Sequence, residues 1–240
     1  MTVKEFLDYL SQELNRSPRT VISYAEDLYA FEAYFLDKDE GLTWETIDTD
    51  IIRDWMESMV DKGNSPSSVA RRLSAVKGFF KFALAREFIS SDPAHAIRSP
   101  KRSRPLPQFL KENEINDLLD KQAWGDDFKG LRDRLIIMML YETGVRLAEL
   151  VGMDDEAVNL TGQFIKGTGK GDKQRVIPFC NELKSMIENY VEERNRTVSR
   201  KTAALLVSET GLRIKPDLVQ RIVKENLARF CSLKKKSPHV

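Results

Sequence analysis

The sequence Ser99-Pro-Lys-Arg-Ser-Arg-Pro-Leu-Pro107 divides this 240-residue chain into two parts. Its prolines exclude a regular helix or strand and favour an extended backbone. The apolar residues on either side recur at helical spacing. We therefore predict a linker over residues 99–107 between two units, residues 1–98 and 108–240, each long enough to bury a core of its own.

The first unit has helical patterns separated by turn signals, and no strand pattern. Ser17-Pro18 and Ser65-Pro66 each place a capping serine before a proline at the first helical position. Asp48 or Thr49 begins another helix, which Lys62-Gly63 closes. We predict an all-helical unit with helices over residues 3–15, 18–35, 49–62 and 66–88.

The second unit is mainly helical and contains one small β-hairpin. The predicted helices cover residues 111–119, 131–142, 182–193 and 216–230. Residues 163–166 and 174–179 predict two strands that flank the turn Gly167-Thr-Gly-Lys-Gly-Asp-Lys173. The whole chain is therefore predicted to be mainly α, with a mixed α/β but mostly helical second unit.

Composition excludes several classes of protein. No apolar run approaches the roughly 20 residues that a membrane span needs, and the N-terminus has no apolar signal region. Cys180 and Cys231 lie far apart without a CxxC pair, so neither a disulfide framework nor a zinc site is expected. We predict a cytoplasmic protein with two unremarkable, buried thiols.

The charges are unevenly distributed, although the formal net charge of the chain is only +1. Residues 1–64 contain six Lys/Arg against fifteen Asp/Glu, whereas residues 65–104 contain nine against two. A basic segment inside a neutral chain can bind phosphates. The basic residues of the linker could follow a phosphate backbone, although Pro- and Lys-rich linkers are common without that role.

The helix predicted after Pro66 has two different faces. One is an apolar stripe of Val69, Leu73, Val76, Phe80 and Ala83. The opposite face has basic residues alternating with small ones, namely Arg71, Ser74, Gly78, Lys81 and Ala85. Small residues would let the helix backbone approach DNA while Arg and Lys reach phosphates. The alternative is the ordinary solvated face of an amphipathic helix.

Two segments of the second unit could bind a phosphate. In Thr143-Gly-Val-Arg-Leu-Ala-Glu-Leu150, Gly144 ends one helix and Arg146 begins the next, where a guanidinium joins free N–H donors. The alternative is an Arg146–Glu149 pair that only stabilises a helix turn. Lys170 lies at the tip of the Gly-rich turn, which lacks the GxxxxGK[ST] pattern of a nucleotide-binding loop and could be a turn only.

These motifs, taken in order, resemble those of one known family. Gly144-x-Arg-x-x-Glu-Leu150, then Lys170, then Lys235-x-Ser-Pro-His239 is similar to the catalytic domain of tyrosine recombinases of the phage-integrase family, with bacterial Xer proteins closest. Ser17–Leu28 and Ser67–Phe80 resemble the second and fourth helices of its core-binding, SAM-like domain. The resemblance covers essentially the whole chain.

The resemblance implies a C-shaped grip on duplex DNA, made by two domains joined by the linker. Arg146 would pair with the scissile phosphate, Lys170 would protonate the leaving 5′-oxygen, and His239 would assist. No metal or cofactor is implied, because arginines stabilise the charge. Homo- or hetero-oligomers, a tetrameric synapse among them, would form on DNA. The predicted DNA-binding residues are Arg19, Thr20, Arg71, Arg72, Lys77, Lys81, Lys101, Arg102 and Arg104.

The sequence departs from the family pattern after His239. The family continues His-x-x-Arg, then a His or Trp, then the nucleophilic Tyr, and none of the six tyrosines here matches that position. We expect a recombinase fragment that binds DNA as a monomer without cleaving it. The alternatives are a naturally truncated, non-catalytic DNA-binding regulator and a helical protein-interaction scaffold. Chromosome-dimer resolution and mobile-element integration both stay open.

Overall fold

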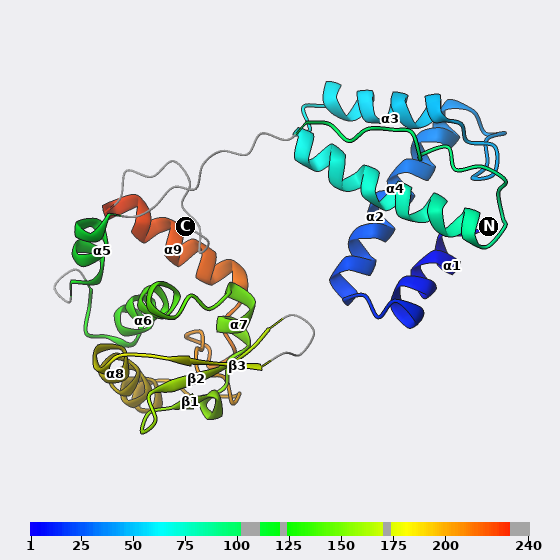
Figure 1. Cartoon of the computed structure of the whole chain (residues 1–240). Helices are drawn as coiled ribbons and strands as arrows, with labels where there is room; N and C mark the ends of the chain where they lie inside the picture. Colours follow the sequence, from blue (N-terminus) through cyan, green and yellow to red (C-terminus); the bar gives the residue numbers. More distant parts are fainter. Residues whose placement is uncertain (102–110, 121–123, 170–173, 231–240) are drawn as a thin grey trace. The chain divides into compact units, whose positions relative to one another are not determined.

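The structure is a computed structural model that describes residues 1–101, 111–120, 124–169 and 174–230 (Figure 1). The chain divides into two compact units, Met1–Pro105 and Leu106–Val240. From residue 102 onward the predicted linker lies outside the described residues. No helix in the described ranges is long and apolar enough to cross a membrane.

Unit 1 is helical wherever it has regular structure. Its elements are α1 (Val3–Asp8), a π-helical turn η1 (Tyr9–Glu13), α2 (Pro18–Lys38), α3 (Thr49–Asp61) and α4 (Pro66–Ala85). The side chains of Ser17, Asp48 and Ser65 accept backbone N–H groups at the starts of α2, α3 and α4, so the predicted starts are confirmed. The end of α4 was predicted three residues too late, because Glu87 turns the backbone to a φ of 59°.

The core of unit 1 forms around α4. All five residues of its predicted apolar stripe are buried, and so are Ala70, Ala75, Phe79 and Phe82, which widens the buried face. Aromatic rings from α2, α3 and the loop after α2 gather against it, with Trp44 and Phe79 only 4.3 Å apart between ring centroids. Such ring pairs stabilise a core by about 0.5–1.5 kcal/mol beyond their buried area.

Unit 2 combines helices with a small antiparallel sheet. Its helices are α5 (Glu112–Leu119), α6 (Phe128–Thr143), α7 (Leu147–Gly152), α8 (Asn181–Thr197) and α9 (Pro216–Phe230), with a 3₁₀ turn η3 (Asp155–Ala157) after α7. The strands β1 (Val158–Asn159), β2 (Phe164–Thr168) and β3 (Gln174–Pro178) are ordered β1-β2-β3. The hairpin was predicted and β1 was not, because two residues are too few for an alternating pattern.

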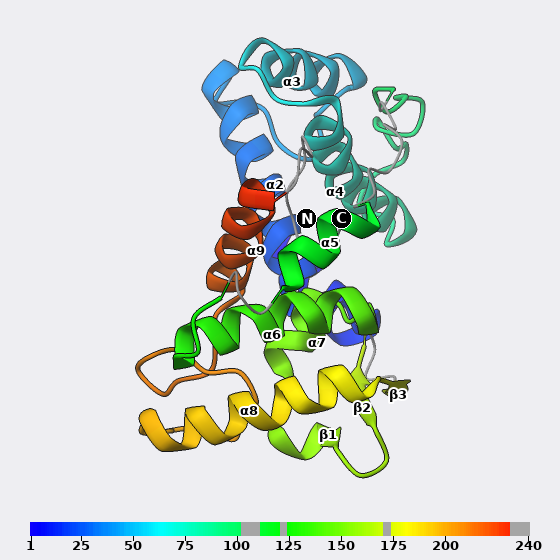
Figure 2. The same ribbon diagram turned by 90° about the vertical axis from the view of Figure 1, so that its left-hand side faces the viewer.

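The register of the hairpin and the packing of α6 determine where unit 2 places its polar residues. Ile165 pairs with Ile177 and Gly167 with Arg175. Helix α6 is the central helix, with residues 135–139 buried, and α8 packs alongside it (Figure 2). Helix α6 begins at Phe128, three residues earlier than predicted, with Asp127 as its cap. Gly144 ends the helix in the left-handed conformation, with a φ of 58°.

One cysteine differs from its prediction. Cys180 was expected to be buried, but its side chain is exposed at the N-cap of α8, because the apolar face of that helix begins only at Leu183. The Cys180 N–H donates to the Glu142 carboxylate at 2.5 Å, which fixes the start of the helix. Cys231 lies outside the described residues.

Candidate functional site

Arg146 occupies the turn between α6 and α7. Gly144 ends α6, and Arg146 is extended at the N-cap of α7, with φ −72° and ψ 153°. The Glu149 carboxylate accepts the Arg146 backbone N–H at 2.9 Å and its guanidinium at 2.7 Å. The backbone N–H of Arg146, one of the donors expected to be free at this helix start, is therefore already paired. The predicted Arg146–Glu149 pair exists, and it orients the arginine.

Sequence reasoning missed a second arginine at this place. Arg175 on β3 donates to Glu149 at 2.8 Å and to the carbonyl of Gly144 at 3.2 Å. A signal was present in the sequence, because Arg175 lies two residues before Ile177 and therefore shares its face of the strand. Ile177 packs against the core, so the alternation places Arg175 on the same inner face, although it does not identify Glu149 as the partner.

The carboxylate of Glu149 is buried, with 3% of its side chain exposed, whereas Arg146 and Arg175 are 65% and 42% exposed. Burial alone would raise the pKa of Glu149, but the hydrogen bonds from Arg146 and Arg175 outweigh it and lower the pKa below its ordinary value. One buried negative charge thus holds two guanidiniums, which leaves one net positive charge facing solvent.

The other predicted catalytic residues, Lys170 and His239, lie outside the described residues. The described strand ends that flank the Gly-rich turn are Thr168 and Gln174, which pair with each other. Arg175 follows Gln174 directly and contacts Glu149, so the base of the hairpin lies beside the start of α7. The roles of Lys170 and His239 stay predictions.

On α4, Arg71 is already paired. Its two terminal nitrogens donate to the two carboxylate oxygens of Asp27 on α2, Nη2 to Oδ1 at 2.7 Å, and Nη1 also donates to Ser23 at 2.7 Å. Arg72 lies farther away, with its Nε 3.8 Å from Asp27. The predicted basic face is therefore partly neutralised by a buried acid.

The other predicted DNA-binding residues differ in their surroundings. Lys77 is half-buried and donates to the carbonyl of Ile97, which makes it a support for the segment after α4. Lys81 is exposed, and no hydrogen bond or ion pair involves it within the described ranges. Arg19 is exposed and Thr20 half-buried in the first turn of α2, while Lys101 is exposed. Arg102 and Arg104 lie outside the described residues.

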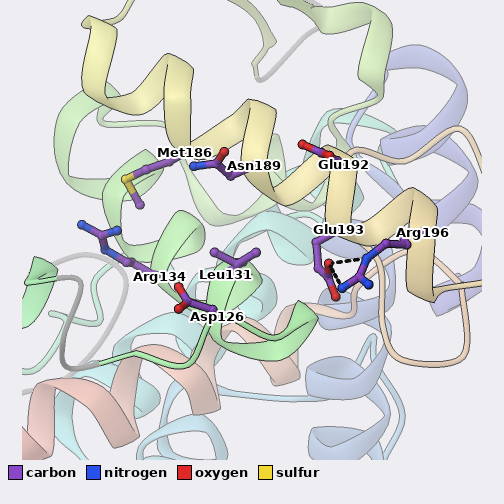
Figure 3. Close-up of a pocket in the computed structure, with 8 residues that line it drawn as sticks. All are labelled: Asp126, Leu131, Arg134, Met186, Asn189, Glu192, Glu193 and Arg196. Atoms are coloured by element: carbon purple, nitrogen blue, oxygen red, sulfur yellow. Dashed lines mark hydrogen bonds and ion pairs between the residues drawn. The ribbon is translucent and has the colours of Figure 1, made fainter.

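A hollow of unit 2 lies away from these residues. A depression of about 310 Å³ lies between α6 and α8 and is lined by Leu131, Arg134 and Met186, with Glu193 paired to Arg196 at its rim (Figure 3). None of the predicted site residues lines it. Among the described residues no three His, Cys, Asp or Glu side chains gather as metal ligands would.

Comparisons with known proteins identify the two units. Residues 3–87 match the phage integrase N-terminal SAM-like domain, and residues 108–240 match the phage integrase family. The chain therefore belongs to the phage integrase family. Tyrosine recombinase XerC of Natranaerobius thermophilus is 34% identical over 98% of this chain and 80% of its own length. XerC of Chlorobaculum tepidum is 31% identical over 98% of this chain and 78% of its own length.

Solved structures agree on the fold. XerH bound to a palindromic difH substrate matches 99% of this chain and 70% of its own, with a TM-score of 0.75 and 19% identity. A lambda integrase dimer bound to a core site matches with a TM-score of 0.69 at 18% identity, over 100% of this chain and 86% of its own. The predicted fold class and family are confirmed, and the tyrosine recombinase family assigns site-specific DNA recombination at the level of the family.

Proposed function

We propose that this chain grips duplex DNA and holds a scissile phosphate in the manner of a tyrosine recombinase, whose strand cleavage passes through a 3′-phosphotyrosyl intermediate, but that these 240 residues do not themselves cleave the strand. The observation that supports it most directly is the half-exposed Arg146 guanidinium, held in place by the buried Glu149. A guanidinium fixed before the reaction stabilises charge that develops on phosphate oxygens. Mutational losses for such donors are about 100- to 1,000-fold in rate.

The remaining roles follow the family resemblance. In this proposal Lys170 donates a proton to the leaving 5′-oxygen, and His239 assists at the phosphate. Arg175 supplies the second half of the cationic surface around Glu149. No step requires a metal ion, since guanidinium and ammonium groups can neutralise the developing charge.

Nucleic-acid binding is assigned to the basic face of α4 and to the first turn of α2. Lys81 on α4 and Arg19 on α2 are exposed. Arg71 and Arg72, also on α4, lie near Asp27 of α2. The structures similar to this fold include recombinases bound to DNA, as dimers and as a tetramer on a Holliday junction. We propose the same polyanionic partner for this chain, with oligomers assembled on DNA and a monomer in its absence.

The nucleophile is proposed to be none of the six tyrosines of the sequence. Four lie in unit 1. Tyr190 is buried in unit 2, where burial raises the pKa of its phenol and its oxygen accepts the Val207 N–H at 3.2 Å. Tyr141 is 56% exposed on the last turn of α6, which makes it the tyrosine to exclude by experiment.

The test has two parts. Fluorescence anisotropy with a duplex across a salt series should show binding whose log affinity falls linearly with log salt. Binding without salt dependence, or none, would favour a helical interaction scaffold. A nicked suicide duplex should give no covalent band from the 240-residue chain on a denaturing gel. A band that disappears in Tyr141→Phe would show that the nucleophile was misassigned.

A further inference from the structure

We propose that Asp27 is a positioning residue for DNA binding, so that this buried negative charge raises the affinity for DNA. The inference rests on the DNA binding proposed above and adds a residue that sequence reasoning did not select. Coulomb's law by itself predicts the opposite sign, because a carboxylate near a DNA-binding face repels phosphates. Removing the Asp27 carboxylate should therefore weaken DNA binding if Asp27 positions Arg71, and strengthen it if Asp27 only repels phosphates.

The geometry fixes the plane of the Arg71 guanidinium. Asp27 is 4% exposed, and both of its oxygens accept from the terminal nitrogens of Arg71. Ser23, one helical turn earlier on α2, accepts from Nη1 as well. Two parallel hydrogen bonds allow a planar group one orientation, which a single ion pair does not. The arginine is nevertheless 50% exposed, and within the described residues its Nε has no acceptor.

Two arginines, Arg71 and Arg72, lie around the buried Asp27, and the neighbouring exposed Glu26 also acts on the charge of Arg71. The Asp27 carboxylate, through its hydrogen bonds, raises the pKa of Arg71, so that residue remains a cation at all accessible pH values. Arg72 approaches the same carboxylate with its Nε at 3.8 Å. Asp27 therefore holds the guanidinium of Arg71 alone, while a terminal nitrogen of Arg72 donates to the sulfur of Met59. The outward edge of Arg71 stays available to phosphate oxygens.

Preorganisation explains how a carboxylate can favour binding. A free arginine side chain loses about 2 kcal/mol of rotamer entropy when it is immobilised. Arg71 has already lost most of this freedom during folding, because Asp27 and Ser23 hold it. DNA then binds an arginine that is already placed, and the cost of ordering it on binding is smaller.

The same pair joins two helices of unit 1. Asp27 lies on α2, whose first turn contains Arg19 and Thr20, and Arg71 lies on α4, which contains Lys81. The helices pack against each other (Figure 1). Asp27 therefore sets the spacing between the two predicted groups of phosphate contacts in addition to the orientation of one arginine.

The experiment compares two substitutions that remove the same charge at adjacent positions. Asp27→Asn removes the buried carboxylate with little change of shape. Glu26→Gln removes an exposed carboxylate for which no hydrogen bond or ion pair exists among the described residues. Anisotropy with one duplex over a salt series should give tighter binding for Glu26→Gln. For Asp27→Asn we expect binding about fivefold weaker, with a salt slope smaller by about one.

Folding is controlled by a milder variant. Ser23→Ala removes only one acceptor of Arg71 and should fold normally, as checked by circular dichroism and urea unfolding. We expect it to weaken DNA binding about twofold and to lower the free energy of unfolding by no more than about 0.5 kcal/mol, because the lost hydrogen bond is exposed to solvent. If Asp27→Asn does not fold, unchanged binding by Ser23→Ala overturns the proposal.

The possible outcomes separate the two proposals. A wild-type chain with no salt-dependent binding would remove the proposed function itself. A wild-type chain that binds DNA, together with an Asp27→Asn variant that binds as tightly as Glu26→Gln, would leave that function intact and remove the role of Asp27.

Discussion

The guanidinium of Arg175 lies 2.8 Å from the carboxylate of Glu149, and this contact joins strand β3 to helix α7. Glu149 also accepts from Arg146, so the base of the hairpin and the proposed phosphate ligand share one buried acid. Unit 1 repeats the arrangement with Asp27, Arg71 and Arg72. In both units a buried carboxylate orients at least one arginine that remains partly exposed, Arg146 and Arg175 in unit 2 and Arg71 in unit 1.

Replacing Arg175 should destabilise unit 2. Arg175→Ala removes two hydrogen bonds, one of them to a buried carboxylate, and we expect the free energy of unfolding to fall by about 1–2 kcal/mol. Urea unfolding, monitored through the hydrogen exchange of α6 amides, would measure this loss of unfolding free energy. Arg196→Ala is the matched control in the same unit, since Arg196 is 73% exposed and pairs with Glu193 one turn away on α8, and its loss should cost less than about 0.5 kcal/mol. Equal losses in the two variants would contradict the role given to Arg175.

The stability of unit 2 should depend on pH through Glu149. Its pKa in the folded protein is lowered below the ordinary value by the hydrogen bonds that outweigh its burial. The stabilisation is therefore complete above the ordinary pKa of Glu and is lost as pH falls through the lowered one. As the pH is lowered from about 5 to about 3, the free energy of unfolding should fall less in Glu149→Gln than in the wild type. Parallel curves for the two proteins would show that Glu149 does not contribute.

Two lysines of α4, both predicted from sequence to bind DNA, should behave differently. Lys81 is exposed, so Lys81→Ala should reduce the salt slope of DNA binding by about one without changing the melting temperature. Lys77 donates to the carbonyl of Ile97, so Lys77→Ala should lower the melting temperature of unit 1. Anisotropy and circular dichroism on both variants measure the two effects. The reverse pattern would show that the contact of Lys77 is not maintained in solution.

Local signals in the sequence predicted much of the fold. A serine before a proline specifies a helix start through one side-chain hydrogen bond and one fixed φ angle, and both such starts are confirmed. The apolar stripe of α4 is buried because a helical period determines a face. Arg146 and Glu149 are three residues apart, so their pairing was also a local prediction.

Contacts between distant segments were not predictable in the same way. Arg175 and Glu149 are 26 residues apart, and Asp27 and Arg71 are 44 apart, so each pairing depends on how whole elements pack. The helical periodicity of α4 predicted that Arg71 lies on an exposed face. It could not show that Asp27 of the neighbouring helix α2 would pair with it. The exposure of Cys180 has the same origin, because it depends on where α8 meets the core.

The proposed role of Arg146 can be tested by supplying a nucleophilic tyrosine. A chimaera in which residues 1–238 are followed by the C-terminal segment of a XerC relative, from the histidine of its His-x-x-Arg motif through its tyrosine, should form a covalent band with a nicked duplex. Arg146→Ala in that chimaera should slow formation of the band about 100- to 1,000-fold, because the guanidinium that meets the developing charge is gone. Arg146→Lys should restore little, since an ammonium cannot bind two phosphate oxygens in the fixed geometry of a guanidinium. DNA affinity measured in parallel should change much less than the rate, as expected for a group that acts mainly in the transition state. A chimaera with Arg146→Ala that cleaves as fast as its parent would place the phosphate elsewhere on unit 2.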